Sequence, residues 1–233
     1  MVSQPGQNSV MRAAPLASEP PRRRFGLVVF DFDGTLADSY AWLVGALNRL
    51  APRYGFRQVT AAEEPELRQL GAAAIMRRLR LPVWKRPLVA RALRRLMARE
   101  IEQIRLFPEM AGLVQTLAAG GVPLAIASSN ACENIAQVLG ERHLACFGEL
   151  ECRIGLGGKP ARLRAMRRRH RLGPRELLYI GDEVRDLHAA RAAGAVSGAV
   201  TWGYNHPDAL RARQPDHLFA QPADIAHLLL PRA

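Results

Sequence analysis

Cysteine is scarce in this 233-residue chain, which contains only Cys132, Cys146 and Cys152. These residues form no Cys-X-X-Cys pair, and no histidine follows them at the spacing of a zinc site, which argues against a structural zinc module. We therefore expect three free, reduced thiols whose main role is packing.

Long apolar runs are also absent. No stretch approaches the roughly 20 apolar residues that a membrane-spanning helix needs. The N-terminus lacks the apolar core of a secretory signal. We accordingly expect a cytoplasmic protein without a membrane partner. An apolar fraction of 48% is sufficient for a hydrophobic core, and the length fits one domain with an insertion.

Aromatic residues make up 6% of the chain, whereas the formal net charge is +12. Arginines cluster at residues 22–24, 77–80, 91–99 and 162–171. Basic clusters can bind nucleic acid, but no stacking platform or nucleic-acid-binding motif accompanies them. We therefore disfavour a nucleic-acid partner and interpret the clusters as solvated faces, or as a positive field that concentrates anionic substrates.

The first 24 residues are rich in Pro, Ser, Gln and Arg without periodicity, which predicts a disordered leader. Beyond them, short apolar runs alternate with helical patterns. This alternation predicts an α/β fold with a doubly wound parallel sheet. The expected strands are Leu27–Phe30, Val122–Ala127, Leu177–Ile180 and Ala195–Thr201, with shorter ones at Phe147–Cys152 and Leu218–Phe219.

Residues 39–107 interrupt this alternation with helical patterns only. An apolar stripe at Leu93, Leu96, Met97, Ile101 and Ile104 has helical spacing. We expect this stripe to pack within an inserted all-helical cap, and we expect no strand there. The predicted organisation is a core of residues 25–38 and 108–233, with the cap at residues 39–107.

Polar side chains follow the predicted strands at their carboxyl ends. In open α/β sheets this edge is where ligands bind. Taken singly, each of these residues could close a turn or cap a helix. Together they predict one polar crevice, formed by Asp31, Asp33, Ser128, Lys159 and Asp182.

Asp31 and Asp33 suit phosphoryl transfer. A carboxylate is already ionised at neutral pH, so Asp31 can attack phosphorus as a nucleophile and form an aspartyl-phosphate. Asp33 is placed to protonate the leaving alkoxide and later to activate water. Carboxylates such as that of Asp182, together with phosphate and water oxygens, are typical Mg²⁺ ligands.

The run Asp31-Phe32-Asp33-Gly34-Thr35-Leu36 resembles the first signature of the haloacid dehalogenase-like (HAD) hydrolase superfamily. Ser128, Lys159 and the run Gly181-Asp182-Glu183-Val184-Arg185-Asp186 resemble its other three signatures, in order. The helical insertion and the tail resemble the phosphoglycolate phosphatase-like branch, which has a small helical cap. The resemblance implies a Rossmann-like core and a cap that closes over the site.

The resemblance also implies roles for these residues. Asp31 would be the nucleophile and Asp33 the acid/base. Mg²⁺ would be held by the Asp31 carboxylate, the Asp33 backbone carbonyl and Asp182. Asp186 could bind the metal through water or hold Lys159, and Glu183 could equally be a helix cap.

The remaining signatures imply a phosphate site. The hydroxyl of Ser128, the backbone N–H of Ser129 and the ammonium of Lys159 would contact the phosphate, aided by the N-terminus of the following helix. Ser128 could instead be a helix N-cap and Lys159 a surface lysine. However, Lys159 is one of only two lysines in the chain, which favours a specific role.

The predicted function is therefore Mg²⁺-dependent hydrolysis of a small phosphorylated metabolite, such as phosphoglycolate. A sugar phosphomutase of the β-phosphoglucomutase type would share the same core. A non-catalytic protein that binds partners through its basic surface is the other alternative. Asp33 argues against dehalogenation, because a halide leaving group needs no proton. The sequence gives no indication of the oligomeric state.

Overall fold

A computed structural model describes residues 24–155 and 157–231. The predicted leader lies outside these residues, apart from Arg24. The centre of the molecule is a six-stranded sheet in the order β5-β4-β1-β6-β7-β8, and every neighbouring pair is parallel. The strands are β1 (Leu27–Phe30), β4 (Leu124–Ala127), β5 (Glu149–Glu151), β6 (Leu177–Gly181), β7 (Val196–Val200) and β8 (His217–Phe219). The predicted α/β class is confirmed.

Helices cover both faces of this sheet. On one face lie α5 (Met110–Ala119), α6 (Cys132–Leu144) and α10 (Pro222–Leu229), and on the other lie α7 (Lys159–Arg169) and α8 (Val184–Ala193). The position of β1 between two layers of helices explains why its sequence is apolar throughout. Val28 and Phe30 pack into the first layer, while Leu27 and Val29 pack into the second, since successive side chains point to opposite faces. A short helix that the sequence analysis did not find, α9 (Pro207–Arg211), follows β7.

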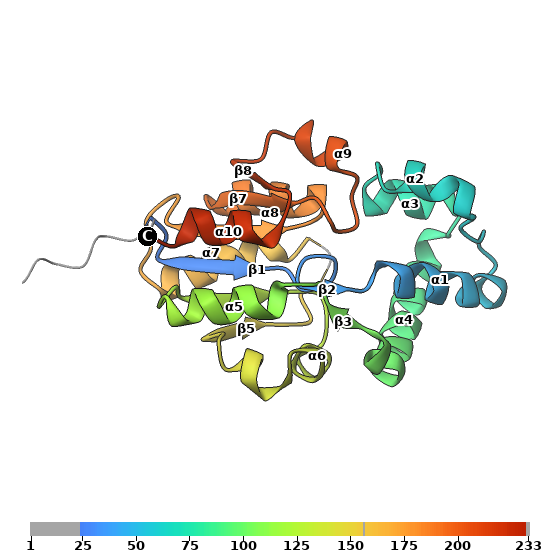
Figure 1. Ribbon diagram of the computed structural model, residues 1–233. Coiled ribbons are helices and arrows are strands. Elements are labelled where there is room, and N and C mark those ends of the chain that lie inside the picture. Colours follow the sequence, from blue (N-terminus) through green and yellow to red (C-terminus); the bar gives the residue numbers. More distant parts are fainter. Residues whose placement is uncertain (1–23, 156, 232–233) are drawn as a thin grey trace, which may run out of the picture.

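The helical insertion lies beyond the carboxyl end of β1 (Figure 1). It has its own apolar cluster, which includes Leu50, Leu67, Leu79 and Val89. Its elements are α1 (Tyr40–Tyr54), η1 (Ala61–Glu63), α2 (Glu64–Leu67), α3 (Ala72–Arg78), η2 (Val83–Lys85), α4 (Arg86–Glu100) and η3 (Ile101–Gln103).

The apolar stripe predicted to pack within the insertion is in fact divided between two clusters. Leu93 and Leu96 pack in the insertion. Ile101 and Ile104 are buried in the core of the sheet, and Met97 packs against that core. The prediction was wrong for these three residues because α4 and η3 lead the chain back to the sheet.

Two very short strands join the insertion to the sheet. β2 (Ala37–Asp38) and β3 (Arg105–Leu106) pair in antiparallel fashion. The expectation that residues 39–107 contain no strand is therefore wrong. A strand of two residues has no detectable alternation, so periodicity could not identify β3. The pairing holds the two ends of the insertion side by side.

Cys132 and Cys152 form a disulfide with a Cα–Cα distance of 5.4 Å. The expectation of three free thiols is therefore wrong for these two, and Cys146 alone is free. Cys132 begins α6 and Cys152 follows β5. Because β4 and β5 are neighbouring parallel strands, the segments after them lie close together although the cysteines are 20 residues apart.

No helix in the described residues is long and apolar enough to cross a membrane.

Candidate active site

The loop after β1 carries the first two predicted site residues. Asp31 is buried at the end of this strand, and its Oδ1 accepts a hydrogen bond of 2.8 Å from the Phe32 backbone N–H. Gly34 makes the turn with a φ of 75°, and a Cβ atom there would lie 2.2 Å from Asp182 Oδ2. Glycine is thus required both by the left-handed backbone and by the close approach of Asp182.

Lys159 lies between two buried carboxylates. Its Nζ donates to Asp31 Oδ2 at 2.5 Å and to Asp186 Oδ1 at 2.6 Å. Burial lowers the pKa of Lys159, but the negative charges of Asp186 and Asp31 raise it more, so the net shift is upward and the ammonium stays charged. The sequence left two roles open for Asp186, which were binding the metal through water and holding Lys159. The structure shows the contact with Lys159.

The pKa values of the two carboxylates shift in opposite directions. For Asp31, burial raises the pKa and outweighs the opposing effect of Lys159. For Asp186, burial also acts to raise the pKa, but Lys159 and Arg185 lower it overall. Asp186 therefore holds its negative charge firmly. Arg185 was not singled out from the sequence, although its position inside the fourth signature was a usable signal.

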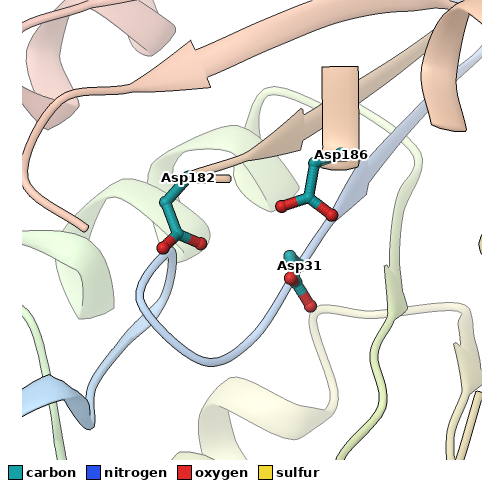
Figure 2. Close-up of side chains that lie close together, drawn as sticks. All are labelled: Asp31, Asp182 and Asp186. Carbon is teal, nitrogen blue, oxygen red and sulfur yellow. The ribbon is translucent and has the colours of Figure 1, made fainter. Parts of the chain in front are cut away.

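Three carboxylates form the candidate metal centre. One oxygen each from Asp31, Asp182 and Asp186 lie within 4.8 Å of one another (Figure 2). Asp182 is fixed by hydrogen bonds from Thr35 Oγ1 at 2.8 Å and from the Tyr204 backbone N–H at 2.7 Å. Burial raises its pKa well above the usual range, and the neighbouring carboxylates add to this. A buried, oxygen-only set of this kind fits Mg²⁺.

Asp33 does not belong to this cluster through its side chain. Its Oδ2 instead accepts a hydrogen bond of 3.0 Å from Asn130 Nδ2, which comes from the loop after β4. Burial, reinforced by the charge of Asp31, raises the pKa of Asp33 to about 6. The sequence analysis missed this role of Asn130, because nothing in a linear sequence connects residues 33 and 130.

The predicted phosphate-binding residues reach the same edge of the sheet. Ser128 is buried at the end of β4, where its Oγ accepts a hydrogen bond of 3.2 Å from the Asn130 backbone N–H. Ser129 is exposed, and it lines a cleft together with Lys159. Glu183 is the N-cap residue of α8, which is the helix-cap role that the sequence left open for it.

The edge of the sheet thus joins a buried carboxylate, a charged ammonium beside it, a second acid of raised pKa and a set of oxygen ligands. Such an arrangement can supply a nucleophile, neutralise the charge of a phosphoryl group and move a proton.

Known proteins resemble this chain over most of its length. A phosphoglycolate phosphatase of Synechococcus elongatus is 33% identical over 199 residues, which cover 85% of this chain and 94% of that protein. A phosphoglycolate phosphatase of Escherichia coli is 27% identical, and the match covers 85% of this chain and 90% of that protein. Among solved structures, a haloacid dehalogenase-like family hydrolase from Streptococcus pneumoniae has a TM-score of 0.74 at 21% identity, with 88% of this chain and 98% of that chain covered.

That structural likeness supports the fold, and the sequence comparison identifies the family. Residues 28–200 match the family described as haloacid dehalogenase-like hydrolase. This range contains Asp31, Asp33, Ser128, Lys159 and Asp182, so it includes all four segments that carry the candidate site. The chain therefore belongs to the haloacid dehalogenase-like hydrolase family.

Proposed function

We propose that this protein is a Mg²⁺-dependent phosphatase that hydrolyses a small phosphorylated metabolite through an aspartyl-phosphate on Asp31. One observation carries the proposal. The buried Asp31 carboxylate contacts the Lys159 ammonium and lies beside Asp182 and Asp186, at the edge of the sheet where ligands bind in this fold class.

In the first step the Asp31 carboxylate attacks phosphorus, and the bond between phosphorus and the ester oxygen breaks. The leaving alkoxide takes a proton from the Asp33 carboxyl group. In the second step Asp33, now ionised, accepts a proton from water as the water oxygen attacks phosphorus. The bond to Asp31 then breaks, and inorganic phosphate leaves. The raised pKa of Asp33, about 6, suits a group that must both donate and accept a proton near neutral pH.

The residues that would hold Mg²⁺ are the Asp31 carboxylate, the Asp33 backbone carbonyl and Asp182. When bound, the ion would offset the repulsion between the anionic nucleophile and the anionic phosphate. Asp186 lies in the same carboxylate cluster, but its Oδ1 is engaged by Lys159, so we assign it to positioning that lysine.

The phosphate itself would contact the Ser128 hydroxyl, the Ser129 backbone N–H and Lys159. A compact ammonium can bridge Asp31 and a phosphate oxygen at once, which a planar guanidinium does less readily. This need accounts for a lysine at this buried position in a chain whose other basic residues are, apart from Lys85, arginines and histidines.

Residues 39–107 would act as a cap that admits substrate and excludes water, over a core of residues 25–38 and 108–233. The contacts of Arg68 support this arrangement. Its Nε donates to the Tyr204 carbonyl at 3.1 Å, and its own carbonyl accepts from Asn205 Nδ2 at 2.9 Å. Residues 203–205 adjoin Asp182, so the position of the cap and the geometry of the site are linked.

Phosphoglycolate is the first substrate to test, because the similar proteins from Synechococcus elongatus and Escherichia coli carry that name. The decisive assay is release of inorganic phosphate from p-nitrophenyl phosphate and from phosphoglycolate, with Mg²⁺ and with EDTA. We expect activity only with Mg²⁺, and we expect Asp31→Asn to abolish it. Asp38→Asn is the matched control, because Asp38 is an exposed aspartate of β2 and should leave turnover unchanged. Full activity of Asp31→Asn would refute the nucleophile assignment.

A further inference from the structure

A cleft of about 1050 Å³ lies between the helical insertion and the carboxyl edge of the sheet. On the sheet side its wall includes Ser129 and Lys159, so the cleft opens onto the proposed phosphate site. On the other side the wall is formed by α3 and α4, with Met76, Arg86 and Arg94 among the contributing residues. A substrate whose phosphate reached Lys159 would therefore extend toward α4.

The described lining of this cleft is strongly positive. It contains five cationic side chains and no carboxylate. A concave surface of one charge raises the local concentration of ions of the opposite charge. The cationic residues are Arg86, Arg94, Arg153, Lys159 and Arg185.

Three of these five cations already have a carboxylate partner within the protein. Lys159 contacts Asp31 and Asp186, Arg153 pairs with Glu133, and Arg185 contacts Glu183. The positive charges of these three side chains are therefore already balanced within the protein, without a further anion.

Arg86 and Arg94 differ from the others. Within the described chain, neither guanidinium forms a hydrogen bond or ion pair. Arg86 Nε is buried without an acceptor, whereas Arg94 is exposed to solvent. An unpaired polar group that is removed from water is costly unless a ligand supplies its partner.

The two arginines share one side of α4. Arg86, Ala90 and Arg94 follow one another at intervals of four residues, which places them in one row along the helix, and all three line the cleft. Arg95 belongs to the same helix but is not part of the cleft wall. The arrangement thus presents two forked donors to the cleft that Lys159 also lines.

We propose that Arg86 and Arg94 determine substrate specificity by binding a second anionic group of the substrate, a carboxylate or a second phosphate. This inference rests on the proposed phosphatase function and narrows its substrate to phosphate monoesters that carry a negative charge at the far end. Arginine suits both groups because its fork matches their paired oxygens. The cleft volume of about 1050 Å³ lies at the upper limit of the roughly 300–1,000 Å³ found for ligand pockets, so the cleft has room for a molecule longer than phosphoglycolate.

A matched series of synthetic substrates tests the proposal. We would measure KM and kcat for alkanediol bisphosphates of two to six carbons, and for the alkyl monophosphate of each length. The ratio of the two KM values at one chain length isolates the effect of the second anion. We expect the bisphosphate to have the lower KM, by roughly tenfold or more at the best length, as for a charge-assisted contact.

The double variant Arg86→Gln/Arg94→Gln should bring this ratio close to one. The variant Arg86→Lys/Arg94→Lys retains the charge and should restore part of the preference. Arg95→Gln removes the same charge from outside the cleft and should leave the ratio at the wild-type value. Circular dichroism of each variant reports whether the fold is intact.

The proposal is overturned if no bisphosphate of the series has a lower KM than its monophosphate. It is also overturned if the preference persists in a folded Arg86→Gln/Arg94→Gln protein. Failure of the phosphatase function itself looks different, because the wild-type enzyme would then release no phosphate from any monophosphate of the series.

Discussion

The substitution Lys159→Met removes the cation that two buried carboxylates share. The exposed fractions of the three side chains are 9% for Lys159, 4% for Asp31 and 0% for Asp186. Methionine keeps most of the volume, so the change is mainly electrostatic. Removing one partner of a buried ion pair costs about 3–5 kcal/mol, because the remaining charge is left without compensation. Here two like charges remain, so we expect a loss near the upper end of that range.

The effect should depend on pH in a defined direction. In the wild type the pKa of Asp186 is lowered, so its contribution to stability is present above the ordinary aspartate pKa and is lost as pH falls. Without Lys159 the pKa values of Asp186 and Asp31 rise, and protonation then relieves their repulsion. The loss of stability in Lys159→Met should therefore be largest at neutral pH and should shrink toward pH 4–5.

The assay is urea unfolding followed by circular dichroism, with EDTA present so that no metal compensates for the lost charge. The free energy of unfolding is obtained by linear extrapolation at several pH values. Lys85→Met is the matched control, because in the described residues Lys85 Nζ contacts no carboxylate. It donates to the neutral Tyr54 carbonyl at 2.7 Å and lies over the Trp84 ring, contacts that together contribute about 2 kcal/mol. The reasoning fails if the two variants lose the same free energy, or if the loss in Lys159→Met grows as pH falls.

Three further predictions concern other parts of the molecule. Asp33→Asn removes the proposed acid and should lower kcat by roughly 10²–10⁴-fold for an alkyl phosphate, and less for p-nitrophenyl phosphate, whose leaving group needs little protonation. Although burial acts to raise it, hydrogen bonds from Ser197 and Arg175 bring the pKa of Asp216 down to about 2. Asp216→Asn should therefore cost about 1 kcal/mol of unfolding free energy at pH 7, after allowance for solvent screening, and the cost should vanish as pH falls from 4 to 2. Reduction of the Cys132–Cys152 disulfide with dithiothreitol should lower the free energy of unfolding by about 3 kcal/mol, as expected for a closed loop of this length. A variant with serine at both positions should show the same loss and should not respond to the reductant.

The fold class and most element positions were predictable from local patterns. The strand Leu27–Phe30 was expected at the bounds that the structure shows, and the expected strand Leu177–Ile180 is one residue shorter than β6. Both segments are uninterrupted apolar runs, which is the pattern of a strand buried on both faces. Local propensity and tertiary context agree in such segments, so the sequence is sufficient.

Very short strands, and contacts between residues far apart in the sequence, were not predictable from local patterns. The two residues of β3 pair only because β2 lies beside them. Ile101 and Ile104 have the spacing of the cap stripe but pack into the core of the sheet, and periodicity cannot tell which of two cores an apolar side chain will enter. The Cys132–Cys152 disulfide likewise depends on the adjacency of β4 and β5.

The same distinction between local patterns and tertiary contacts applies to the candidate site. The sequence alone identified Asp31, Asp33, Ser128, Lys159 and Asp182, because each follows a strand or opens a helix and parallel strands present their carboxyl ends at one edge. The tertiary structure decided which of these side chains touch. It paired Lys159 with both Asp31 and Asp186 and turned Asp33 toward Asn130. On the wall of the cleft it left Arg86 and Arg94 without partners among the residues that the structure describes. Residue type and order specify which groups reach the edge, whereas distance and burial, which set their charge state and their partners, arise only when the chain is folded.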